Sequence, residues 1–118
     1  MRIAVDKQGG LFPVDRRVEV DDHAVTVIDI PTGSTAEEAA VRVQPLATAD
    51  AVRLTELATL VVAAGDQIDD GPGGVDGGTT LIDVDDGQGQ SRVEIRMGAT
   101  TTQSVWDLLD AVDRLMPR

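Results

Sequence analysis

Residues 1–20 read MRIAVDKQGGLFPVDRRVEV, and this stretch decides the fold predicted for the chain. Apolar and polar residues alternate on both sides of the pair Gly9 and Gly10, which is typical of two strands joined by a reversal. Glycine suits the reversal because it reaches positive φ without a Cβ penalty. Leu11 and Phe12 follow at once, and Phe12 is the only phenylalanine in the protein. We therefore expect a hairpin that carries two large apolar side chains at its tip.

The composition sets limits on the domain count and on the partners. A chain of 118 residues can bury one core and is too short for two domains. Its net charge of -11 argues against nucleic acid or an anionic membrane as a partner, because both would repel it. The absence of cysteine excludes disulfides and thiolate zinc sites. We find no signal-peptide pattern and no run of about 18 apolar residues, so we expect a cytoplasmic protein. The sequence does not indicate the oligomeric state.

Two segments carry apolar residues at spacings of three and four, which predicts helices over 48–64 and 103–116. Their apolar stripes comprise Leu54, Leu57, Val61 and Ala64 in the first and Val105, Leu108, Leu109, Val112 and Leu115 in the second. The expected caps are Thr48 or Asp50 and Gly65 for the first helix, and Thr101 or Thr102 for the second.

A second hairpin is predicted from the alternation in 79–84 and 91–97, on either side of Asp86 and Gly87. Its expected inward side chains are Ile82, Val84, Val93, Ile95 and Met97. On the outward side, Asp83 and Asp85 can meet Arg92 and Arg96.

Hairpins join the strands in each half, so we expect an α+β fold with a mainly antiparallel sheet of four or more strands and two helices packed on one face. The element order is β-β-(insert)-α-β-β-α within a single domain, 1–118. The insert, 21–45, is uncertain, although 24–30 alternates like a strand and Ser34 begins a pattern typical of a short helix. Residues 66–78 hold five glycines and four aspartates and are expected to form a flexible loop.

The search for catalytic and metal motifs yields no site. His23 is the only histidine, so a His-Glu-x-x-His zinc motif is excluded, and a solvated turn histidine is the favoured interpretation. Asp83, Asp85 and Glu94 fit three positions of a calcium loop, but its glycine is displaced to Gly87 and the flanks are strands. We therefore predict no catalytic residues, no cofactor and no metal site, with 66–78 as a weak candidate for a divalent ion.

Five stretches together resemble the small emfourin-like proteins, whose namesake inhibits protealysin, a thermolysin-like metallopeptidase. They are MRIAVDKQGGLF followed by RRVEVD, then LTELATLVVAAGD, TTLIDVDDGQGQSRVEI and VWDLLDAVDRLMP. The resemblance covers residues 1–20 and 46–117. It implies a proteinaceous inhibitor of a thermolysin-like or protealysin-like metallopeptidase, and not an enzyme.

A physical account of inhibition accompanies this resemblance. Thermolysin-like enzymes favour a bulky apolar residue just after the scissile bond, and Leu11 or Phe12 on a rigid loop would fill that pocket. Gly9 and Gly10 would permit a close backbone approach, and Pro13 would resist cleavage. These five residues are the predicted partner-binding site.

Trp106 supports an alternative hypothesis. It lies beside the apolar stripe of 103–116, where packing at the edge of the core is the favoured interpretation and an exposed interaction anchor is the other. The alternative function is a non-enzymatic interaction or regulatory module of unknown partner that uses the sheet face or Trp106. A small enzyme is the least favoured reading, because no acid/base pair with histidine is found.

Overall fold

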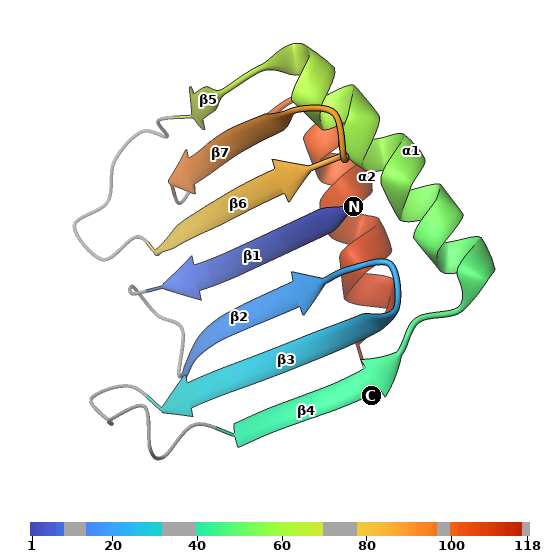
Figure 1. The fold of residues 1–118 in the computed structure, drawn as a ribbon. Coiled ribbons are helices and arrows are strands. Elements are labelled where there is room, and N and C mark those ends of the chain that lie inside the picture. Colours follow the sequence, from blue (N-terminus) through green and yellow to red (C-terminus); the bar gives the residue numbers. More distant parts are fainter. Residues whose placement is uncertain (9–13, 32–39, 70–77, 97–99, 117–118) are drawn as a thin grey trace.

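The computed structural model describes residues 1–8, 14–31, 40–69, 78–96 and 100–116, which form a seven-stranded sheet with both helices on one face (Figure 1). The strands are β1 (Arg2–Gln8), β2 (Val14–Val20), β3 (Ala24–Pro31), β4 (Ala40–Pro45), β5 (Gln67–Asp69), β6 (Thr79–Asp85) and β7 (Gln90–Arg96). The helices are α1 (Thr48–Ala64) and α2 (Gln103–Arg114). This arrangement confirms the predicted α+β class, the mainly antiparallel sheet and the order of the predicted elements.

The sheet order is β4-β3-β2-β1-β6-β7-β5, so the first strand of the chain lies at its centre. Val5 of β1 is paired with Val18 of β2 on one side and with Ile82 of β6 on the other. All neighbouring strands are antiparallel except β5, which pairs with β7 in parallel. Helix α1 joins β4 at one edge of the sheet to β5 at the other edge.

Residues 21–45, expected to be an uncertain insert, contribute two strands. The alternation over 24–30 is confirmed as β3, whereas β4 was not predicted. The short helix expected from Ser34 lies outside the described residues.

The expectation of a loop over 66–78 is wrong for its first part, because Gln67–Asp69 form β5. The carboxylate of Asp66 accepts the backbone N–H of Arg92 at 2.8 Å and aligns the segment with β7. Three residues are too few to show an alternation in the sequence, which is why the strand was missed. Residues 70–77 lie outside the described part of the chain.

The core lies between the sheet and the helices, where the predicted inward residues meet. The buried apolar side chains are Ile3, Val5, Val18, Val20, Val25, Val27, Leu54, Leu57, Ala58, Val61, Ile82, Val84, Val93, Ile95, Val105, Leu108 and Val112. Leu109 and Leu115 pack against this cluster as partly buried residues. In α1, Ala58 belongs to the buried stripe, whereas Ala64, which was predicted to belong to it, is exposed. Met97, predicted to face inward from the second hairpin, lies outside the described residues.

The helix starts differ in part from the expected caps. Ala47 is the N-cap of α1, so Thr48 and Asp50 are not caps, while Thr102 is the N-cap of α2 as one of the two predicted threonines. Neither N-cap residue makes a side-chain capping bond. Gly65 ends α1 as predicted, with its N–H donating to the carbonyl of Val62 at 3.0 Å.

Replacing Gly65 by Ala is expected to lower the free energy of unfolding by at least about 1 kcal/mol. Gly65 has φ of 80° and ψ of -175°, a conformation that residues with a Cβ avoid. Nothing lies within 4 Å of an added Cβ, so the expected loss is conformational and not a clash. Urea unfolding of both proteins measures it, and equal midpoints at equal slopes would contradict it.

An ionic cluster joins β2, β3 and β4 through Asp29. Its carboxylate accepts hydrogen bonds from Arg16 at 2.5 and 3.0 Å and from Arg42 at 3.3 Å. The bond from Arg16 is the main cause of a pKa for Asp29 below its ordinary value, and the charges of both arginines add to it. The cluster therefore stabilises the fold in the ionised form of Asp29.

This lowered pKa gives a prediction on pH. A carboxyl whose pKa is lower in the folded state contributes stability above its unfolded pKa of about 3.9, and the contribution is lost as the pH falls through the folded value. Asp29→Asn should therefore lower the free energy of unfolding by about 1 kcal/mol near neutral pH. Urea unfolding should show the two proteins converging at acid pH, and a constant difference would contradict the assignment.

Candidate functional site

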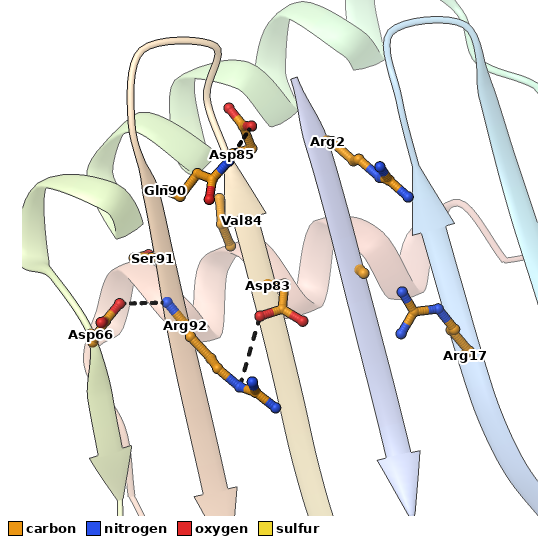
Figure 2. A pocket seen from close by; sticks show the side chains of 10 residues that line it. Arg2, Arg17, Asp66, Asp83, Val84, Asp85, Gln90, Ser91 and Arg92 are labelled. Carbon is orange, nitrogen blue, oxygen red and sulfur yellow. Dashed lines mark hydrogen bonds and ion pairs between the residues drawn. The ribbon is translucent and has the colours of Figure 1, made fainter.

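The sheet face turned away from the helices carries a hollow of about 540 Å³ above β1, β6 and β7 (Figure 2). Side chains alternate along a strand, so Ile3 and Val5 face the helices while Arg2 and Ala4 face the open side. Ala4 is buried by the longer side chains around it, between Glu19 of β2 and Asp83 of β6 in the register. The residues lining the hollow are Arg2, Ala4, Arg17, Asp66, Asp83, Val84, Asp85, Gln90, Ser91 and Arg92.

Arg17 forms one wall of the hollow and is held by two carboxylates. Its Nε donates to Glu19 at 2.7 Å, and its Nη1 donates to Asp6 of β1. The bond to Glu19 is the main cause of a raised pKa for Arg17, and the charge of Asp6 adds to it. The guanidinium is thus fixed on the boundary between β1 and β2.

On the other side of the hollow, Asp83 and Arg92 face each other across β6 and β7. Their carboxylate oxygen and Nε are 3.8 Å apart, as the predicted hairpin pairing requires. Asp85 instead accepts the N–H of Gly87 at 2.8 Å and the amide of Gln90 at 3.1 Å, and these bonds lower its pKa. The predicted contact of Asp85 with an arginine is therefore replaced by turn bonds.

Arg2 makes no hydrogen bond or ion pair with the residues that the structure describes. Figure 2 shows its side chain on the same side of β1 as that of Arg17. An unpaired guanidinium at the rim of a hollow can donate to a carboxylate or a carbonyl of a bound molecule. The hollow is therefore suited to hold a polar group of a partner.

Sequence reasoning did not find this hollow. Arg2, Arg17, Asp83 and Arg92 are far apart in the chain, and each one alone is typical of a solvated strand face. Only the strand register brings them around Ala4.

The predicted partner-binding residues Gly9, Gly10, Leu11, Phe12 and Pro13 lie outside the described residues. The structure does place the two strands that flank them. Lys7 of β1 is paired with Arg16 of β2, at the end of β1 opposite Arg2.

Trp106 of α2 is 44% exposed and lines a groove at the same end of the sheet as Lys7. The groove also includes Thr80, Ile95 and Leu109, and Thr80 is the register partner of Lys7. Trp106 therefore lies at the edge of the core and is also partly exposed to solvent. Both interpretations from the sequence, core-edge packing and an interaction anchor, are compatible with this position.

The remaining candidate features from the sequence, the single histidine and the acidic residues, form no metal site in the described part of the chain. His23 is exposed in the turn between β2 and β3, where its backbone N–H donates to Asp21 at 2.7 Å. Within the described ranges, no three His, Cys, Asp or Glu side chains are grouped to hold a metal ion. Neither described helix has the length and apolar character needed to cross a membrane.

Comparisons of the chain with family models, curated proteins and solved structures found no match.

Proposed function

We propose that this protein is a non-enzymatic inhibitor of a thermolysin-like or protealysin-like metallopeptidase, with residues 9–13 entering the active-site cleft. The observation that carries the proposal is the placement of the flanking strands. β1 and β2 are paired as far as Lys7 and Arg16, so residues 9–13, which follow β1 and precede β2, connect two strands inside the sheet and not at its edge.

The flanking strands form a rigid support. β1 is hydrogen-bonded on both sides, and Ile3 and Val5 are buried in the core. Arg17 also ties β2 to Asp6 of β1. Holding both ends of a binding segment lowers the entropy lost on association, which favours tight binding to a cleft.

The chemistry of the segment supports the choice of target. Leu11 and Phe12 provide the apolar side chain that such enzymes select, and the resemblance to the emfourin-like proteins points to the same enzyme class. The groove beside Trp106 lies at this end of the sheet and offers the enzyme a second apolar contact.

We further propose a cytoplasmic location and a protein partner, with neither nucleic acid nor membrane bound. The net charge of -11 repels both polyanions.

The test is a titration of thermolysin and protealysin with this protein, with the residual hydrolysis of a short peptide substrate as the readout. A segment that occupies the cleft should inhibit competitively and raise KM without changing kcat. The assay needs calcium in excess, because a protein of charge -11 can also lower the activity of a calcium-stabilised enzyme by withdrawing its calcium. The absence of inhibition across several such enzymes would refute the proposal.

The hollow on the open face favours a second candidate, a non-inhibitory module that binds its partner through the sheet. In that case Arg2→Ala should weaken the binding of the partner. The same change should leave inhibition untouched if residues 9–13 are the site, because Arg2 lies at the opposite end of β1.

A further inference from the structure

The sheet ends at β4, whose outer edge is unpaired among the described residues. The backbone N–H of Leu46 donates to the carbonyl of His23 at 2.9 Å, directly beyond the pair Ala24 and Pro45. Hydrogen-bonded pairs alternate along an antiparallel ladder. The pairs made by Gln44 and Arg42 with β3 are therefore also hydrogen-bonded ones.

It follows that Val41 and Val43 direct their backbone N–H and C=O groups outward, away from β3. The next outward residue is Pro45, which has a carbonyl but no N–H. The free edge of β4 thus offers two N–H donors, those of Val41 and Val43. Pro45, the last residue of the strand, has no N–H to add a third.

The side chains of this edge are also unusual for a free strand. Val41 and Val43 are 58% and 66% exposed on the open face of the sheet. Natural edge strands are commonly protected by charged side chains, but residues 40–46 contain no carboxylate. Their one charge, on Arg42, is directed to Asp29 at 3.3 Å.

We propose that two copies of this chain associate through β4, antiparallel about a two-fold axis at Val43, so that one continuous sheet crosses both copies. Val43 then exchanges two hydrogen bonds with its counterpart. The N–H of Val41 donates to the carbonyl of the partner's Pro45, and symmetry gives the same bond from the partner to this copy. On the other face, Arg42 lies across from the partner's Gln44. This register places no like charges opposite each other and pairs the exposed valines with apolar neighbours.

Charge selects a second copy as the occupant. A chain of net charge -11 repels its own kind over most of its surface, but residues 40–46 contain no carboxylate, so pairing through β4 brings no acidic side chains of this strand together. The other edge, β5, has three residues, with Asp66 before it and Asp69 within it. A head-to-tail contact of β4 with β5 is shorter and would leave open ends, whereas the β4 pair closes with two-fold symmetry.

This association is independent of the proposed inhibition. β4 is separated from β1 by β3 and β2, so neither β1 nor the edge that β2 shares with β1 takes part in the pair.

Sedimentation equilibrium from about 1 µM to about 1 mM should show a mass approaching twice 12.4 kDa. Val43→Pro removes an outward N–H and leaves the bonds to β3 in place, so it should weaken association at least about tenfold. Val43→Thr, which keeps the N–H, is the matched control and should still associate. Val43→Lys places like charges on the axis and provides a second test if the proline variant does not fold.

Amide hydrogen exchange gives a readout without substitution. Exchange at Val41 and Val43 should slow as the concentration rises, whereas exchange at Arg42 and Gln44, which already bond to β3, should not change. A monomer at about 1 mM would overturn the proposal. Association unaffected by both the proline and the lysine variants would overturn it too, since the interface would lie elsewhere.

Discussion

Replacing Leu108 by Ala should lower the free energy of unfolding by about 2–5 kcal/mol, a large part of the stability of a small domain. Leu108 is 0% exposed on α2 and belongs to the core between the helices and the sheet. Two effects contribute to this loss of free energy. The variant buries less apolar surface on folding, and the removed atoms leave a cavity that the surrounding residues do not fully close.

Leu60→Ala is the matched control for this change. The same atoms are removed from α1 at a position that is 55% exposed, so the expected loss is within about 0.5 kcal/mol. Urea unfolding at equal protein concentration compares the two variants. Similar midpoints for both would show that α2 does not pack on the sheet.

The double substitution of Leu11 and Phe12 by Ala should weaken inhibition of the metallopeptidase by about thirtyfold, or about 2 kcal/mol of binding free energy. An apolar anchor in a desolvated pocket contributes most of the energy of such contacts. Because the core side chains remain in place, the melting temperature should stay close to that of the native chain.

Gln88→Ala is the control for this second prediction. Gln88 is exposed in the turn between β6 and β7, at the end of the sheet opposite residues 9–13. It should inhibit like the native chain. Equal inhibition by the double variant would move the binding site away from the tip, with the groove beside Trp106 as the next place to examine.

The elements with one buried face could be predicted from the sequence, because burial imposes a period on their apolar residues. In β1, for example, Ile3 and Val5 alternate with polar residues, and in α2 the stripe through Leu108 marks a helix. The end of α1 could be predicted as well, because a helix often ends at a glycine, and Gly65 has the positive φ that glycine adopts most easily.

The edges of the sheet were less predictable, for physical reasons. In β4 the valines face the open side and the polar Arg42 and Gln44 face the helix side, which reverses the usual pattern. β5 depends on a parallel pairing with β7 that no local rule specifies. The hollow was unpredictable for the same reason, because Arg17 and Asp83 reach Ala4 only through pairings between distant strands.

The central position of β1 also bears on how the protein is made. β1 is synthesised first, yet its second neighbour, β6, follows α1 in the chain. The first four strands can pair during translation, but one side of β1 stays open until residues 79–85 leave the ribosome. Such long-range pairing slows folding, so the finished sheet forms late, and until then the open side of β1 is an unpaired strand edge on which nascent chains can aggregate.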